Sequence, residues 1–169
     1  LSANEELQST NEELETSKEE LQSANEELGT LNLELRNKNI ELQDVSNDIS
    51  NLLNSTRIPV VMLDRRLCIR RITPAATKLL KVLAADIGRP FADIKLNIEA
   101  SDMTSHDLEL LIGKVLDSLQ PVEREMRDLE GCWHRLSILP YRTQDNKIDG
   151  VVLALQDIHA VKTANEQLA

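Results

Sequence analysis

Aromatic residues are nearly missing from this sequence of 169 residues, which holds one Phe, one Trp and one Tyr. Surfaces that stack the bases of RNA or single-stranded DNA need several rings, and a formal net charge of −10 repels a phosphate backbone. We therefore expect no nucleic-acid partner. Cysteine is scarce too, because Cys68 and Cys132 are too few and too far apart for a disulfide framework or a Cys-only zinc site, which favours a reducing compartment.

Long apolar runs are also missing. No stretch approaches the roughly 20 residues that a membrane span needs, and the first residues lack the basic and apolar regions of a secretory signal. The composition, 41% apolar and 28% charged, is typical of a soluble protein with room for one ordinary domain and an extension. We predict a cytoplasmic location and a segment taken from a longer protein.

Negative charge, proline and glycine are distributed unevenly along the chain. Residues 1–56 hold 13 acidic and 3 basic residues, so they carry the whole net charge of −10 (3 − 13), whereas residues 57–169 hold 16 of each sign. All five prolines and four of the five glycines lie after residue 56. This change in composition predicts three parts: a coiled-coil signalling helix at 1–56, a globular domain at 57–159, and the start of an output helix at 160–169.

The first part repeats every seven residues. An apolar residue closes each of seven consecutive heptads, and this column, which we call the leucine column, comprises Leu7, Leu14, Leu21, Leu28, Leu35, Leu42 and Ile49. An unbroken heptad column predicts a coiled coil, and a helix of this length needs another helix to cover its apolar side. We predict a parallel homodimer with the leucine column as its seam. The alternative is a disordered acidic segment, because polar low-complexity repeats can stay unfolded in isolation.

The register of this coil is ambiguous at its start. If the leucine column occupies the d positions, the a positions hold mostly Asn, and the paired Glu residues fall at b and c, outside the seam. If the leucines instead occupy a, the d positions run from Thr10 and Ser17 to Val45 and Leu52, and so improve toward the C-terminal end. Two nearly equivalent registers are what a bistable relay element requires.

From residue 58 the pattern changes to short apolar runs typical of strands. Residues 58–64 and 67–73 are rich in strand-forming apolar residues and are joined by a two-arginine turn, which predicts a hairpin. Three further strands are predicted at 121–131, 132–143 and 148–158, separated by polar, turn-forming residues.

Two helices are predicted between these two groups of strands. Thr73 followed by Pro74 is typical of an N-cap and a first helical position. Either Thr104 or Ser105 is expected to cap a second helix that ends near Leu119. The predicted fold class is therefore α+β: a long N-terminal helix followed by two strands, two helices separated by turns, three strands and a last helix.

Local motifs in this order resemble those of PAS sensor domains, a family with a five-stranded antiparallel sheet and helices on one face. The stretch ITPAATKLL (72–80) resembles the family's helix start after the second strand, and DIGRPFADI (86–94) resembles its Gly-to-Asp element. Asp157-Ile158 resembles the terminal D-I-T that leads into the output helix, although His159 stands where Thr is usual. The resemblance implies that Asp157 and Ile158 form the signal exit of the domain.

The whole chain more specifically resembles the bacterial hybrid chemotaxis-type sensors that fuse a methylesterase and a receptor glutamate methyltransferase to a coil, PAS domains and often a histidine kinase. The resemblance is carried by the run NEELQSTNEELETSKEELQSANEEL and by the stretches NLLNSTRIPVVMLDRRLCIRRITPAATKLL and LPYRTQDNKIDGVVLALQDI. It implies a sensor and linker segment of a two-component or chemotaxis-like signalling protein, whose enzymatic activities belong to other domains.

Motifs for catalysis and for cofactors are missing. The sequence has no G-x-G-x-x-G and no P-loop, so we expect neither an S-adenosylmethionine site nor an ATP site. Residues 86–100 lack the Cys that flavin-binding PAS photoreceptors keep in a helix, and His106 lies only at the start of the helix that carries the ligand in haem-binding PAS domains. Cys132 and His134 lack a third metal ligand nearby. We therefore expect no enzymatic activity, cofactor or metal in this segment.

A small-molecule pocket is the alternative function. Aliphatic and aromatic side chains between the sheet and the helices are the candidate lining: Leu63, Ile69, Leu80, Phe91, Leu111, Leu136, Ile138 and Val152. Because no convergent polar group accompanies them, we expect a packed core rather than a cavity here. The leading interpretation is thus a non-catalytic sensor, relay and dimerisation module, and the alternative is a PAS domain that senses a small metabolite in this pocket.

Overall fold

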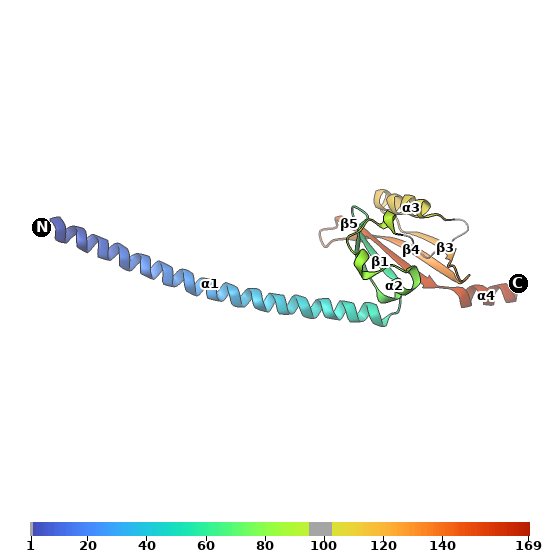
Figure 1. The fold of residues 1–169 in the computed structure, drawn as a ribbon, viewed down its shortest axis with the longest axis horizontal. Helices are drawn as coiled ribbons and strands as arrows, with labels where there is room; N and C mark the ends of the chain where they lie inside the picture. Colours follow the sequence, from blue (N-terminus) through green and yellow to red (C-terminus); the bar gives the residue numbers. More distant parts are fainter. Residues whose placement is uncertain (1, 95–102) are drawn as a thin grey trace. The chain divides into compact units, whose positions relative to one another are not determined.

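Two units make up the chain. The structure, a computed structural model, describes residues 2–94 and 103–169, and it divides into a unit of residues 1–50 and a unit of residues 51–169. Helix α1 (Ser2–Ser55) forms the first unit, and its C-terminal end belongs to the second (Figure 1). The second unit contains β1 (Val60–Asp64), β2 (Ile69–Ile72), α2 (Pro74–Leu80), η1 (Ala84–Asp86), η2 (Phe91–Asp93), α3 (Ser105–Ser118), β3 (Val122–Arg127), β4 (Trp133–Arg142), β5 (Ile148–Asp157) and α4 (His159–Leu168).

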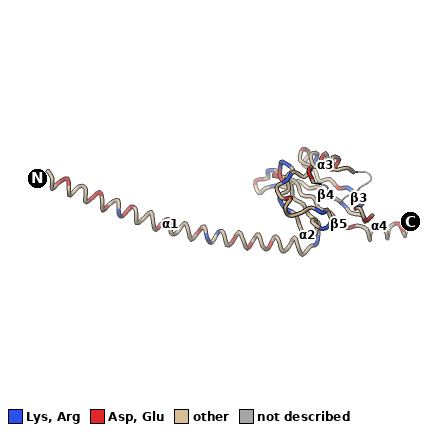
Figure 2. The backbone as a smooth tube through the Cα atoms, viewed as in Figure 1, with Lys and Arg blue, Asp and Glu red and all other residues tan. Residues whose placement is uncertain are grey.

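Helix α1 has no buried residue anywhere along its length. The members of the leucine column keep between 42% (Ile49) and 71% (Leu21) of their surface exposed. Recurring Leu and Glu residues, which favour helix, and the absence of proline sustain the helix past Gly29. Figure 2 shows that the charges along α1 are mostly acidic. The prediction of a long N-terminal helix is confirmed.

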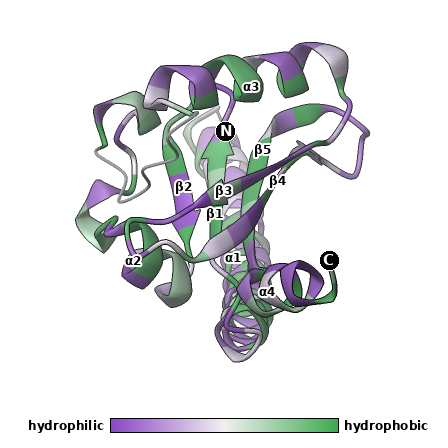
Figure 3. Ribbon diagram, turned by 90° about the vertical axis from the view of Figure 1, so that its right-hand side faces the viewer, coloured by the Kyte–Doolittle hydropathy of each residue, from purple (hydrophilic) through white to green (hydrophobic). Residues whose placement is uncertain are grey.

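The five strands form one antiparallel sheet in the order β2-β1-β5-β4-β3. The last strand, β5, lies between β1 and β4, so the sheet joins the beginning and the end of the domain. Strands β2 and β3 are its two edges, and α3 lies over one face (Figure 3). The predicted α+β class and the predicted order of elements are both confirmed.

Side-chain caps fix the starts of the two domain helices. The Thr73 hydroxyl accepts a hydrogen bond from a backbone N–H in the first turn of α2, and Pro74 occupies the first helical position. Thr104 and Asp107 form a reciprocal capping box at the start of α3. Hydrogen bonds from Thr104 lower the pKa of the Asp107 carboxyl. The sequence predicts the cap at Thr73 and narrows the second cap to Thr104 or Ser105, because a cap depends only on residues a few positions apart.

The hydrophobic core lies between one face of the sheet and helices α2 and α3. Side chains at alternate positions of the strands point into it, as the two-residue period of a strand requires. Its buried members from these elements are Val61 and Leu63 (β1), Ile69 (β2), Ala76 and Leu80 (α2), Leu108, Ile112 and Val115 (α3), Met126 (β3), Leu136 and Ile138 (β4), and Val151, Leu153 and Leu155 (β5). The opposite, outer face of the sheet carries the remaining strand residues.

The prediction that Val152 lies on the inner face of the sheet is wrong. Val152 pairs across the sheet with Met62 and Leu139, one position out of phase with the core residues Val151 and Leu153. Because side chains alternate along a strand, Val152 lies on the outer face, where it is half-buried. The error arises because β5 is apolar at consecutive positions, so hydrophobicity alone does not reveal which of its two faces points inward.

Candidate functional site

The junction between β5 and α4 holds the predicted signal exit. Asp157 ends β5, and its Oδ1 accepts a hydrogen bond from the backbone N–H of His159, 2.8 Å away, at the first residue of α4. Ile158 is only 4% exposed, and its N–H donates to the carbonyl oxygen of Trp133 at 2.9 Å. An acidic side chain at a helix start satisfies a free N–H group and complements the helix dipole. The start of α4 is therefore tied to the sheet by one polar and one apolar anchor.

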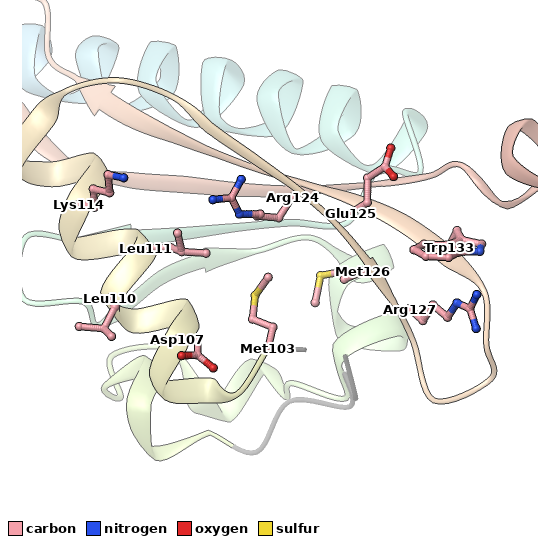
Figure 4. A pocket seen from close by; sticks show the side chains of 10 residues that line it. All are labelled: Met103, Asp107, Leu110, Leu111, Lys114, Arg124, Glu125, Met126, Arg127 and Trp133. Carbon is pink, nitrogen blue, oxygen red and sulfur yellow. The ribbon is translucent and has the colours of Figure 1, made fainter. Parts of the chain in front are cut away.

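Trp133, at the start of β4, connects α4 to the outer face of the sheet. The guanidinium carbon of Arg127 lies 4.3 Å from the centroid of its ring, and the Nζ of Lys162 lies 5.1 Å from it. Both distances suit cation–π attraction. Arg127 is the cross-strand partner of Trp133 on β3, and Figure 4 shows the two side chains next to each other. Because Lys162 comes from the first turn of α4, one ring links β3, β4 and α4.

Glu125 of β3 completes this group. Its carboxylate lies 2.5 Å from the Nζ of Lys162 and 3.7 Å from an Nη of Arg135, its cross-strand partner. The hydrogen bond from Lys162 lowers the pKa of the Glu125 carboxyl and, with the charges of Lys162 and Arg135, outweighs the opposing effect of desolvation. We call Glu125, Arg127, Trp133, Arg135 and Lys162 the Trp133 cluster.

The turn between β3 and β4 holds a more buried polar pair. One carboxylate oxygen of Asp128 lies 2.8 Å from Nε2 of His134, and the other accepts the backbone N–H groups of Glu130 and Cys132. Desolvation raises the pKa of the Asp128 carboxyl, but the hydrogen bonds from His134 and the backbone outweigh it, so the net shift is downward. Nδ1 of His134 is buried and has no hydrogen-bond partner among the described residues.

A groove of about 760 Å³ lies between α3 and the edge strand β3. Its lining comprises Met103, Asp107, Leu110, Leu111 and Lys114 on one side, and Arg124, Glu125, Met126, Arg127 and Trp133 on the other (Figure 4). The groove adjoins the Trp133 cluster, since three residues of that cluster belong to its lining. Flexible Met side chains give such a surface the ability to adapt to different shapes.

Of the eight residues predicted to line a pocket, Leu111 lines this groove and the other seven lie outside it. Six of them are at most 4% exposed and belong to the core: Leu63, Ile69, Leu80, Phe91, Leu136 and Ile138. Leu111 packs against that core while half-buried, and it also lines the groove beside β3. Val152 lies on the outer face. The structure thus brings six of the eight residues together as a packed core and leaves the groove to other side chains.

Sequence reasoning did not find the Trp133 cluster. Opposite charges at Glu125 and Arg135, and a cation and a ring at Arg127 and Trp133, stand directly across from each other on β3 and β4. This signal appears only once the register of the two strands is known. Lys162 comes from a helix that follows both strands, and no local pattern connects it to them.

Within the two described ranges, no group of three or more His, Cys, Asp or Glu residues is arranged to hold a metal ion. No helix in the same ranges is both long enough and apolar enough to cross a membrane. Both cysteines are free and half-buried. Desolvation, together with the Asp128 carboxylate, raises the pKa of the Cys132 thiol, so little of the reactive thiolate forms at neutral pH.

The sheet order, with its helices inserted between β2 and β3, defines a PAS-type α+β domain. The family model described as "PAS domain" matches residues 49–159, and the chain belongs to this family.

Similar proteins include one relative by sequence and two structures with a similar fold. An uncharacterized 104.1 kDa protein of Rhodobacter capsulatus is 35% identical over 121 residues, which cover 72% of this chain and 12% of that protein, so the chain spans about an eighth of its length. A Vibrio cholerae VqmA–ligand–DNA complex is 18% identical, with 69% of this chain and 51% of that chain covered and a TM-score of 0.52. An RNA-binding light-oxygen-voltage receptor is 14% identical, with 73% and 36% covered and a TM-score of 0.54. At such low identities the two structures share the fold alone.

Proposed function

We propose that this chain is a non-catalytic relay and dimerisation module of a larger bacterial signalling protein. The observation that carries the proposal is the leucine column of α1: its seven side chains recur at heptad spacing, and each is at least 42% exposed on a helix without buried residues. Most helical stability in proteins comes from packing of an apolar face, so this column calls for a partner helix. The proposed partner is α1 of a second copy of the chain.

Helix α4 is the proposed output element. The Trp133 cluster ties its first turn to β3 and β4, while Asp157 and Ile158 tie it to β5 and β4. A change in the packing of the sheet therefore changes how α4 is anchored. Because the domain stands between α1 and α4 in the sequence, a change in how α1 pairs can in this way be transmitted to α4.

The proposed parent protein is a cytoplasmic hybrid of the chemotaxis or two-component type, in which a methylesterase, a receptor glutamate methyltransferase and in many cases a histidine kinase supply the enzymatic activities. Support comes from the acidic heptad run and the two strand-rich stretches that resemble such sensors. The Rhodobacter relative, in which the matching part is only 12% of the length, supports a module within a much larger protein.

Molar mass in solution tests the proposed dimer. Sedimentation equilibrium of the chain should give twice the 19.0 kDa mass of one copy. Leu35→Gln, a change within the leucine column, should shift the equilibrium toward monomer, whereas Asn37→Gln, outside both possible seams, should leave it unchanged. A monomeric mass for the unsubstituted chain at micromolar concentration would overturn the proposal.

The relay itself requires the pairing to differ between signalling states. Cysteines introduced at Leu7 and Leu35 of the complete parent protein should crosslink to different extents in the different states. Equal crosslinking in every state would leave a dimerisation segment without a relay role and would reject that half of the proposal.

Sensing of a small metabolite is the second candidate function, and the groove beside β3 favours it. Its volume of about 760 Å³ lies within the range of roughly 300–1,000 Å³ that is typical of ligand sites. Met103, Leu111 and Met126 offer apolar contacts, and Lys114 and Arg124 offer positive charge for an anionic group. Native mass spectrometry of the purified chain should then show bound mass. A clean ligand-free spectrum, with no thermal shift across a metabolite panel, would contradict this candidate.

A further inference from the structure

We infer that the α1 helices of two copies pair in parallel and that one register holds over the C-terminal half, with the leucine column at a and with Leu31, Val45 and Leu52 at d. This inference rests on the proposed dimer; it adds the register, which the sequence pattern left open, and an argument from charge for the parallel orientation. It follows from two properties of α1: the distribution of apolar side chains and the position of its acids.

The apolar side chains of the C-terminal half favour one register. With the leucine column at a, the d positions between residues 28 and 52 are Leu31, Lys38, Val45 and Leu52. The apolar members of this seam at both positions are 42% to 67% exposed, so all have surface to bury. With the column at d instead, the a positions of the same stretch are Asn32, Asn39 and Ser46. Burial of hydrocarbon instead of amide and hydroxyl groups favours the first register.

The acids of α1 select the orientation in this register. An acid occupies every g position from Glu6 to Asp48, while the e positions from Asn11 to Asn39 hold four Asn residues and Lys18. In a parallel pair, g of one helix faces e of the next heptad of its partner, so the five acids from Glu6 to Glu34 each meet an amide or the lysine, and Glu41 meets the hydroxyl of Ser46. In an antiparallel pair, g faces g, and two columns of acids repel each other. The parallel arrangement is the one that avoids this repulsion.

Lys38 is the charged interruption of the seam. Its Nζ lies 2.7 Å from a carboxylate oxygen of Glu41, which is the g residue that follows it. Both side chains are more than half exposed, so the ion pair by itself is weak. At d in a parallel pair, the two copies of Lys38 face each other across the seam. Lys38 therefore lowers the stability of this register and keeps the other register within reach.

Disulfide formation reads the register and the orientation directly. In a background whose two native cysteines are replaced by alanine, Leu31→Cys and Val45→Cys should each oxidise readily to a covalent dimer. The matched neighbours Asn32→Cys and Ser46→Cys should react slowly, because their Cβ atoms point out of the seam and exceed the short separation that a disulfide needs.

Each other outcome of this experiment has a distinct meaning. Faster crosslinking at positions 32 and 46 overturns the register while the dimer stands. Crosslinking at only one of positions 31 and 45 overturns the parallel orientation, because an antiparallel pair brings a residue to its own copy at only one level. A monomeric mass before oxidation overturns the proposed function itself, so the two failures are distinguishable.

The role of Lys38 has its own test with a matched control. Lys38→Leu should lower the dissociation constant of the dimer by about tenfold or more, because it removes a repulsion and completes an apolar seam. Arg36→Leu removes the same charge at a b position, outside the seam, and should change the constant by less than about threefold. Equal effects of the two substitutions would show that net charge, rather than the seam, is responsible and would overturn the assignment.

Discussion

Gly150 is a residue whose lack of a side chain the fold requires. It stands opposite Asp64 in the pairing of β5 with β1, and its φ of +153° is one that other residues rarely adopt. A Cβ atom there would lie 1.9 Å from the carbonyl oxygen of Leu63, which belongs to the backbone and cannot move aside alone. We expect Gly150→Ala to lower the free energy of unfolding by about 3 kcal/mol, as measured by urea denaturation.

Gly113 provides the matched control. It lies within α3, and a Cβ there would meet no atom within 4 Å. Gly113→Ala should raise the free energy of unfolding by about 0.5–1 kcal/mol, because alanine loses less conformational freedom in a helix. Similar destabilisation by both substitutions would show that the close approach at Gly150 is not the cause.

The sequence predicts the role of a single residue well when that role depends on near neighbours in the chain. It predicts the role poorly when the role depends on contacts with distant segments. The caps depend on neighbours three residues away, so Thr73 was predictable and the second cap was narrowed to Thr104 or Ser105, of which the structure shows Thr104. The face of Val152 depends on the pairing of β5 with two other strands, and the prediction failed there. The contact between Trp133 and Lys162 joins two elements, so it became visible only in the fold.

At the scale of elements, the anchoring of α4 depends on the Trp133 cluster. Trp133→Ala removes the ring between Arg127 and Lys162, and with it about 1–2 kcal/mol of docking free energy. We expect amide hydrogen exchange in the first turn of α4 to become about 5- to 30-fold faster, with no change in α3. Tyr141→Ala is the control, since that ring lies on the same strand and contacts Arg70 instead. Equal acceleration by both variants would contradict the role of the cluster.

The same anchoring should depend on pH through Glu125. Its pKa is lowered in the folded protein, chiefly by the hydrogen bond from Lys162, so the ionised form is the one that stabilises the docked helix. This contribution is complete above the ordinary pKa of glutamate and is lost as the pH falls through the lowered value. The protection of α4 amides, measured relative to the intrinsic exchange rate at each pH, should therefore fall at acidic pH in the unsubstituted chain.

Glu125→Gln should remove this dependence, because glutamine has no proton to gain in the acidic range. Glu123→Gln, on the same outer face of β3, should keep it, since Glu123 takes part in no ion pair among the described residues. An unchanged acid response in the Glu125 variant would assign the effect to another carboxylate.

The element order and class were predictable because strand and helix periods are local properties, and the grouping of the five strands into one antiparallel sheet came from the family resemblance. The Trp133 cluster and the groove beside β3 are products of register, the relative positions of strands that are far apart in sequence. Patterns within single segments of the sequence do not reveal the register between two strands. The choice between a pocket and a packed core stayed open in the sequence for a related reason: apolar residues on the inner face are compatible with both, and only the missing polar group favoured the packed core.

For the whole molecule, the net charge of −10 belongs to α1 and not to the PAS domain, whose segment 57–169 is balanced. A parallel dimer brings two such acidic helices together, so their mutual repulsion opposes pairing and salt should relieve it. We expect the dissociation constant of the dimer to fall as ionic strength rises from about 0.01 M to about 0.5 M, while the free energy of unfolding of the domain changes little.

The dependence of thermal unfolding on protein concentration distinguishes the unfolding of α1 from that of the PAS domain. Unfolding of a coil that pairs two chains is bimolecular, so its midpoint must rise with protein concentration, whereas a domain with its own core unfolds independently of it. Trp133 is the only tryptophan and lies in the sheet, so its fluorescence reports the domain, while far-ultraviolet circular dichroism is dominated by the 54 residues of α1. A tenfold increase in concentration should raise the thermal midpoint seen by dichroism and leave that of Trp133 fluorescence in place. If both midpoints rise together, the PAS domains unfold with the coil as one cooperative dimer, and the separation of a pairing helix from an independent sensor domain is wrong.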